Sequence, residues 1–181
     1  VTGANGFVGA NLVRALLREG ESVRAFVRPG SDRASLAGLD AEVVTGSFDD
    51  PASLDRALAG CDVLYHVAAL YRLWPPDPAP YRAANVDGTR AVMAAALRAR
   101  PPRIVHTSTV GAVGSAPRGG NANEDASWDL GADGDPYVIS KHEAEEEVLR
   151  LCGAGLPAVV VNPAAPIGPW DRKPTPTGRL V

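Results

Sequence analysis

The stretch that decides the fold is Thr-Gly-Ala-Asn-Gly-Phe-Val-Gly at residues 2–9. Gly3 permits a tight turn, Gly6 lets the backbone approach a pyrophosphate, and Gly9 lets a following helix pack closely on the preceding strand. The N-terminus of that helix would offer free N–H groups to phosphate oxygens. Because a glycine-rich turn is often only a turn, the motif indicates a dinucleotide site only where strands and helices alternate after it.

Short apolar runs alternate with helix-like periods along the rest of the chain, which is typical of βα units and a parallel sheet. Val1 is interpreted as the end of a first strand, expected at the centre of the sheet. The further strands are expected at 23–27, 42–45, 62–66, 103–107 and 158–161, the helices around 12–20, 54–58, 86–97 and 137–152, and a polar loop or lid at 114–135. The sequence therefore predicts an α/β fold, a Rossmann-type doubly wound parallel sheet.

The bulk composition is that of an ordinary globular protein. The chain has 181 residues, enough for one domain with a sizeable core, with 45% hydrophobic and 22% charged residues. A net charge of -3 gives no sign of a nucleic-acid partner. Cys61 and Cys152 lie far apart without metal-ligand spacing, which fits a reducing cytoplasm. No signal peptide and no transmembrane segment is expected.

Both ends of the sequence look truncated. A phosphate-binding glycine loop should follow a full buried strand, yet only Val1 and Thr2 precede Gly3. The last residues follow a proline-rich stretch without a closing element. We therefore expect residues 1–181 to be an NAD(P)-binding Rossmann domain that is incomplete at both ends.

The choice of nucleotide should depend on residues about 20 positions after the glycine loop, at the end of the second strand. An acidic residue there would bind a ribose 2′-hydroxyl, whereas this chain has Arg28, with Arg33 nearby and no carboxylate before Asp32. A guanidinium suits a 2′-phosphate, so NADP is favoured over NAD. The alternative is a solvated arginine, with the adenosine held by backbone contacts.

A candidate acid/base set consists of Thr109, Tyr137 and Lys141, with Ser108 as the alternative hydroxyl. Tyr137 and Lys141 are four residues apart and share a helix face. An ammonium close to a phenol favours the phenolate and is expected to lower its pKa, which suits alcohol–carbonyl chemistry. A hydroxyl at the carboxyl end of strand 103–107 could polarise a substrate oxygen. The alternative is a surface Tyr–Lys pair on an amphipathic helix.

Other candidate residues have simpler interpretations. His66, His106 and His142 lack metal-ligand spacing, so no metal site is expected. Trp128, Trp74 and Tyr71 could line a pocket, although ordinary packing explains each equally well. Glu143 and 145–147 are most simply a solvated helix face.

Together these residues resemble the extended short-chain dehydrogenase/reductase family, which includes the NAD-dependent epimerases and dehydratases. The matching pieces are T-G-A-N-G-F-V-G at 2–9, H-V-A-A at 66–69, N-V-D-G-T at 85–89, H-T-S-T at 106–109, Y-V-I-S-K at 137–141 and N-P-A-A-P-I-G-P at 162–169. The resemblance implies Tyr137 as base, Lys141 as its partner and ribose anchor, and Thr109 as the catalytic hydroxyl. It also implies a smaller C-terminal substrate domain, mostly missing here, into which residues 163–181 would lead.

The motifs and the resemblance together imply a set of cofactor-binding residues. These are Gly3, Asn5, Gly6, Phe7, Val8, Gly9, Arg28, Ser47, Phe48, Val67, Ala68, Ala69, Asn85, Thr107, Tyr137, Lys141 and Pro163. Ser47 stands where many relatives carry an Asp that contacts the adenine, which would alter that contact.

Two longer stretches, 71–78 and 173–179, are similar to the hopanoid-associated sugar epimerase group, while Val27-Arg28-Pro29 resembles the dihydroflavonol-reductase-like branch. The first hypothesis is thus an epimerase or dehydratase acting on a nucleotide sugar. The alternatives are an NADPH-dependent ketone or aldehyde reductase and a non-enzymatic nucleotide-sensing regulator. The expected partners are a small-molecule substrate and, in a homodimer, a second copy of the chain.

Overall fold

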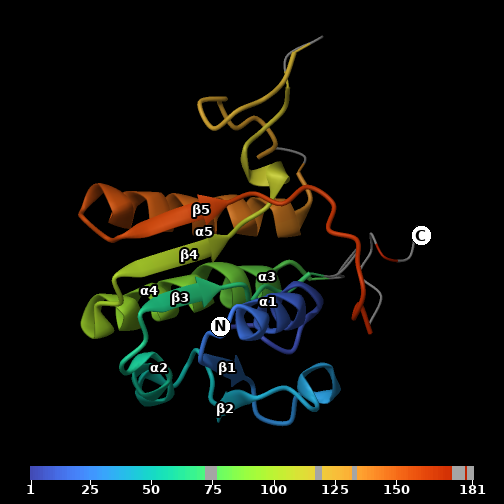
Figure 1. Cartoon of the computed structure of the whole chain (residues 1–181). Coiled ribbons are helices and arrows are strands. Elements are labelled where there is room, and N and C mark those ends of the chain that lie inside the picture. The colour runs from blue at the N-terminus through green and yellow to red at the C-terminus, as the bar shows by residue number, and fades with distance from the viewer. Residues whose placement is uncertain (72–76, 117–119, 132–133, 173–177, 179–181) are drawn as a thin grey trace.

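The strands of the computed structural model, which describes residues 1–71, 77–116, 120–131, 134–172 and 178, form a parallel sheet. They are β1 (Val23–Val27), β2 (Ala41–Thr45), β3 (Val63–His66), β4 (Arg103–Thr107) and β5 (Ala158–Val161). β1 pairs with β2, and β4 pairs with both β3 and β5. Thr2 forms bridges to Phe26 and His66 and so lies between β1 and β3. The predicted Rossmann sheet and its central first segment are confirmed (Figure 1).

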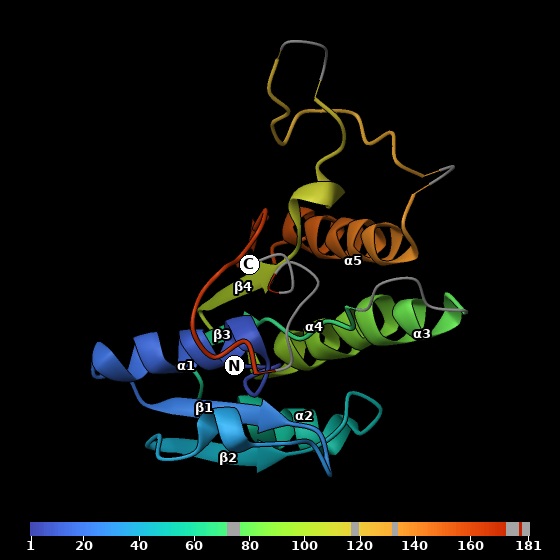
Figure 2. The ribbon, with the colours of Figure 1, turned by 90° about the vertical axis from the view of Figure 1, so that its right-hand side faces the viewer.

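Helices cover both faces of the sheet (Figure 2). The longer ones are α1 (Phe7–Arg18), α2 (Pro51–Leu58), α4 (Gly88–Ala99) and α5 (Pro136–Gly153), and the short ones are η1 (Ala34–Leu36), α3 (Ala79–Tyr81), the π-helical η2 (Arg82–Asp87) and η3 (Val110–Ala112). α1 lies on one face, and α2, α4 and α5 lie on the other. None of the described helices is both long and apolar enough to cross a membrane.

The alternation of side chains along β1 explains the two layers, because successive residues of a strand point to opposite faces. Val23, Ala25 and Val27 pack with Val13 of α1 in one buried cluster. Phe26 points the other way and joins the larger cluster formed by residues of α2, α4 and α5. Both cores are therefore built on the same strand.

The helix expected at 86–97 begins earlier than its sequence pattern indicated. α3, η2 and α4 follow one another without a break from Ala79 to Ala99. The Asp77 carboxylate accepts a hydrogen bond from Ala79 N (2.9 Å), and Pro80 sits in the first turn, where a missing N–H costs nothing. The wider turns of η2 break the 3.6-residue period of apolar residues. The sequence pattern therefore did not predict that the helix begins at Ala79.

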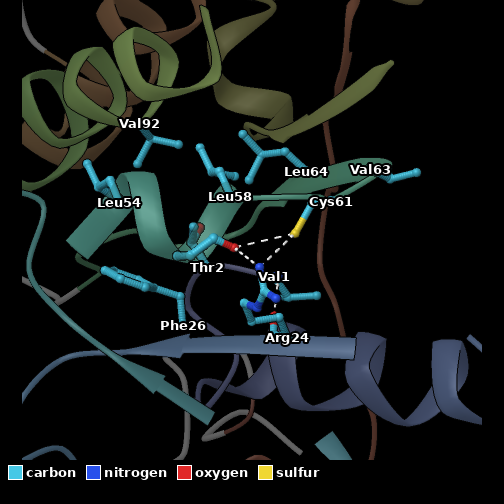
Figure 3. A pocket seen from close by; sticks show the side chains of 11 residues that line it. Val1, Thr2, Arg24, Phe26, Leu54, Leu58, Cys61, Val63, Leu64 and Val92 are labelled. Carbon is cyan, nitrogen blue, oxygen red and sulfur yellow. Dashed lines mark hydrogen bonds between the residues drawn. The ribbon is translucent and has the colours of Figure 1, made fainter. Parts of the chain in front are cut away.

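The Arg24 side chain links β1 to the end of α2 through hydrogen bonds, beside a small cavity (Figure 3). Its guanidinium donates hydrogen bonds to Ala57 O (3.0 Å) and Ala59 O (2.8 Å) and an ion pair joins it to Glu42 (2.8 Å). The last carbonyls of a helix lack partners within the helix, so a cationic donor satisfies them well. Arg24 therefore takes part in capping α2.

Two histidines lie side by side in the core, on adjacent positions of β3 and β4. The ring centres of His66 and His106 are 5.3 Å apart, and both side chains are buried. Thr2 Oγ1 accepts hydrogen bonds from Val67 N and Ala68 N, so its own hydrogen is directed to His66 Nδ1 (2.7 Å). His66 Nε2 then donates to Thr89 Oγ1 (3.0 Å). Among the described residues, neither ring nitrogen of His106 has a partner.

The two histidines are expected to respond differently to replacement by leucine. His66→Leu leaves two buried hydroxyls without their partner and should cost about 1–3 kcal/mol of unfolding free energy, whereas His106→Leu should change it by less than about 1 kcal/mol. Urea unfolding of both variants in the full-length protein at neutral pH measures this. Equal losses would contradict the assigned hydrogen bonds.

Acid should weaken the fold through the same pair. Burial, the largest cause, lowers the pKa of His66 to about 3 and that of His106 to about 2. Between these values and the unfolded value of 6.5 the unfolded chain binds more protons, so stability falls as the pH falls below about 6.5. His106→Leu should flatten this fall, and an unchanged slope would show that His106 does not titrate on unfolding.

Candidate active site

The predicted site residues converge on the carboxyl edge of the sheet, because most of them follow the end of a parallel strand. Arg28 follows β1, Ser47 and Phe48 follow β2, residues 67–69 follow β3, Ser108 and Thr109 follow β4, and Pro163 follows β5. The glycine loop follows Thr2 in the same way. The fold therefore brings together segments that are far apart in sequence.

The glycine loop is packed too tightly for side chains. A Cβ on Gly9 would lie 2.1 Å from Gly3 O, and one on Gly3, whose φ is +65°, would lie 2.7 Å from Ala68 Cα. α1 begins directly afterwards with Gly6 as its N-cap and no side-chain cap. Its first N–H groups therefore lack helical partners, and Phe7, Val8 and Gly9 can present theirs to an anion. This cradle fits a nucleotide pyrophosphate.

The loop after β1 is bonded to the glycine loop. Asn5 Nδ2 donates to Asp32 O (2.8 Å), and Ser35 Oγ donates to Asn5 O (2.8 Å). Arg33 donates to Thr45 Oγ1 (2.7 Å), while Arg28 is exposed and its guanidinium donates no hydrogen bond within the described part of the chain. The Arg28 guanidinium is therefore available to a ligand at this edge.

Two of the predicted cofactor residues also have packing or tethering roles. The Phe48 ring stacks on Phe26 with centres 5.9 Å apart, and its edge faces His66. Asn85 Oδ1 accepts from Leu70 N (2.7 Å), and its Nδ2 donates to Leu70 O (3.1 Å) and Ser140 Oγ (2.9 Å). The Asn85 amide thus fixes the segment after β3 to α5.

Tyr137 lies in the first turn of α5. Asp135 caps the helix, accepting from Tyr137 N (2.7 Å), and Pro136 occupies its first position. The Tyr137 ring packs on Tyr71 (centres 4.5 Å apart) and faces Tyr81 edge-on (6.3 Å). Sequence reasoning did not identify Tyr81, which belongs to no recognised motif, and gave no role to Ser140, although Ser140 lies inside the Y-V-I-S-K motif.

The expected lowering of the Tyr137 pKa is wrong for this structure. Burial, followed by the neighbouring Tyr71, Asp135 and Tyr81, raises the pKa of Tyr137 to about 12. Lys141 points instead to the strand end, where its Nζ donates to Thr107 O (2.7 Å). The phenol of Tyr137 therefore stays protonated at neutral pH in this structure.

Lys141 is almost fully buried, and burial lowers its pKa to about 8, opposed by the nearby Glu145. Its unfolded pKa is 10.5, so between about pH 8 and 10.5 the unfolded chain binds more protons and stability rises with pH. Below pH 8 the full cost of the buried charge is present. At neutral pH Lys141 is therefore still charged, but the pH is close to its pKa.

Lys141→Met is therefore expected to gain stability relative to the parent most at neutral pH, with the gain shrinking as the pH approaches about 10.5. Thermal melting of the nucleotide-free full-length protein at several pH values measures this difference. Arg150→Met is the control on the same helix, since an arginine does not titrate in this range. A difference that is constant with pH would contradict the buried charge.

Thr109 and Ser108 lie beside the start of the segment after β5. Ser108 N donates to Val161 O (2.8 Å), and Asn162 Nδ2 donates to Thr109 O (3.1 Å). Pro163 O accepts from Val110 N (3.0 Å), so the predicted proline does lie next to the candidate hydroxyls. Ser108 Oγ is buried without a partner among the described residues, whereas Thr109 is half-buried.

Trp128 has a packing role in the loop before α5. Its ring stacks on His142 with centres 3.8 Å apart, and Nε1 donates to Gly111 O (3.1 Å). Trp74 and residues 173–177 and 179 lie outside the described residues. Within the described part, no group of three or more His, Cys, Asp or Glu side chains could hold a metal ion.

Comparison with known proteins gives matches over the whole chain. Residues 1–181 match the NAD dependent epimerase/dehydratase family. The chain is 44% identical over 181 residues to a protein of Synechocystis sp. named putative dihydroflavonol 4-reductase, covering 100% of this chain and 52% of that protein. It is 45% identical to the sterol demethylase protein B of Methylococcus capsulatus, covering 100% of this chain and 55% of that one.

The fold also matches solved structures. The crystal structure of gox2253 superimposes with a TM-score of 0.92 at 47% identity, covering 99% of this chain and 55% of that one. This chain thus spans about half the length of the relatives that it matches.

Proposed function

The chain belongs to the NAD-dependent epimerase/dehydratase family, and on this basis we propose that it carries the nucleotide site and acid/base residues of an NADPH-dependent reductase, which converts a ketone or aldehyde to an alcohol. The observation that carries this proposal is the placement of Tyr137 and Lys141 on α5, with the Lys141 ammonium bonded to Thr107 O directly before the hydroxyls that follow β4. A reduction needs a proton donor at the substrate oxygen, and the phenol of Tyr137 can donate one.

In this proposal each residue has one task. When bound, the nicotinamide supplies the hydride that forms the new C–H bond at the carbonyl carbon. Tyr137 transfers its proton to the carbonyl oxygen and is reprotonated from solvent, so that the carbonyl gains one hydride and one proton. Thr109 donates a hydrogen bond to the same oxygen and polarises it. Lys141, whose ammonium donates to Thr107 O, places a positive charge one helical turn from the phenolate that forms.

The preference for NADPH rests on Arg28. Its exposed guanidinium at the end of β1 suits a 2′-phosphate, because charge-assisted contacts to phosphate are strong. Arg28→Ala in the full-length protein is therefore expected to weaken NADPH binding about tenfold and to leave NADH binding unchanged. Arg103→Ala, an exposed arginine at the opposite edge of the sheet, is the control. Titration with both nucleotides measures this, and equal losses for both would contradict the assignment.

A second candidate is an epimerase or dehydratase that acts on a nucleotide sugar, which the description of the matched family favours. Such an enzyme returns the hydride to its substrate and therefore retains its nucleotide. Native mass spectrometry of the full-length protein as purified separates the two. An empty site that fills with NADPH supports the reductase, whereas stoichiometric retained nucleotide would contradict it and direct assays to sugar nucleotides.

The wider organisation of the protein is also a proposal. We propose that residues 163–181 lead into a substrate domain, which agrees with relatives about twice as long as this chain. Two free cysteines agree with a cytoplasmic location. A homodimer stays a prediction that size-exclusion chromatography with light scattering would test.

A further inference from the structure

The segment 162–172 leads from the end of β5 to α1 (Figures 1 and 2). At its start, Asn162 is bonded to Thr109 O. At its far end, Asn11 Nδ2 donates to Pro169 O (2.8 Å), and a Cβ on Gly168 would lie 3.8 Å from Phe7 Cζ. The segment therefore ends against the helix whose N-terminus we assign to the pyrophosphate.

A cation–π contact secures this end. The guanidinium carbon of Arg14 lies 3.8 Å from the centre of the Trp170 ring. Trp170 has a φ of +71°, a left-handed conformation that is uncommon for a bulky residue and persists only where surrounding contacts favour it. Arg14 is itself held in place, because it donates to Ala10 O (2.9 Å). The tryptophan therefore rests on a guanidinium with a fixed position.

The same guanidinium reaches the loop after β1. Arg14 donates to Ser35 O (2.7 Å), Ser35 Oγ donates to Asn5 O, and the Asn5 amide is bonded to Asp32 O. Arg14 thus joins segment 162–172 to the glycine loop and to the loop that carries Arg28. Both loops border the proposed nucleotide site. Arg14 itself lies in α1 beyond the first turn, so it is not one of the residues at the helix N-terminus.

We propose that Arg14 and Trp170 are positioning residues, which hold segment 162–172 against α1 and thereby slow the release of bound nucleotide. The inference rests on the proposed nucleotide site. If the contact is broken, the segment can move away from the helix N-terminus, and the dissociation rate rises while the association rate is little changed.

The test is stopped-flow measurement of NADPH dissociation from the full-length protein. Excess NADP is added to occupy each site as NADPH leaves it. Trp170→Ala and Arg14→Met should each raise the dissociation rate about fivefold, in line with one cation–π contact. The double variant should release NADPH no faster than the faster single variant, because both changes remove the same contact. Trp170→Phe keeps an aromatic face and should restore most of the slow release.

Arg18→Met is the matched control, since Arg18 is an exposed arginine on α1 that lines the same surface hollow. Asn11→Ala removes the second tether and should also speed release, which keeps the test open if Trp170→Ala does not fold. Unchanged rates in Trp170→Ala, Arg14→Met and Asn11→Ala, with NADPH still bound, would overturn this inference alone. A parent protein that binds neither NADPH nor NADH would overturn the proposed function as well.

Discussion

Tyr137→Phe is expected to lower kcat by about 10²- to 10⁴-fold, because it removes the proton donor and leaves the rest of the ring in place. Nucleotide affinity should stay within about twofold, since no hydrogen bond joins the phenol to the described residues of the glycine loop or of the loop after β1. Initial rates with NADPH and a panel of ketones and aldehydes, together with nucleotide titrations, measure both quantities in the full-length protein.

Tyr71→Phe is the matched control, because its ring packs on Tyr137 and only its hydroxyl would be lost. It should keep kcat within about tenfold of the parent. Full activity in Tyr137→Phe would refute the acid/base assignment. If Tyr137→Phe also left an in vivo phenotype unchanged while nucleotide binding persisted, the nucleotide-sensing regulator would become the better explanation.

Much of the fold was predictable because the strands are short and mostly apolar, and several of them border a glycine or proline. β1, β4 and α5 lie where the pattern placed them, and Thr2 occupies the expected centre of the sheet. Local signals sufficed, since a parallel sheet buries continuous apolar runs. The start of the helix at Ala79 was missed because a π-helical segment does not keep the periodicity on which the prediction depended.

The site was predictable as a set of residues but not as an electrostatic environment. The motifs identified Tyr137 and Lys141, yet the pKa of Tyr137 depends on burial and on the rings of Tyr71 and Tyr81, which come from distant segments. The contact of Arg14 with Trp170 likewise joins residues that share no motif. Spacing along the chain gives helix faces and strand ends, whereas burial requires the tertiary structure.

Gly9→Ala should have the largest effect on the nucleotide site of any methyl-sized change. The new Cβ would lie 2.1 Å from Gly3 O, and a backbone carbonyl cannot move aside as a flexible side chain can. The higher helix propensity of alanine relative to glycine offsets this clash by only about 1 kcal/mol of unfolding free energy. We expect a net loss of about 3 kcal/mol or more in unfolding free energy. NADPH affinity should fall at least about tenfold, because the glycine loop must separate from α1.

Gly153→Ala is the control for this substitution. Gly153 is the last residue of α5, and nothing lies within 4 Å of a Cβ added there. The variant should be neutral or up to about 1 kcal/mol more stable than the parent. Denaturant unfolding and NADPH titration of both variants in the full-length protein measure the contrast. If Gly9→Ala matched Gly153→Ala in both measurements, the close packing of α1 on the glycine loop could not be what shapes the nucleotide site.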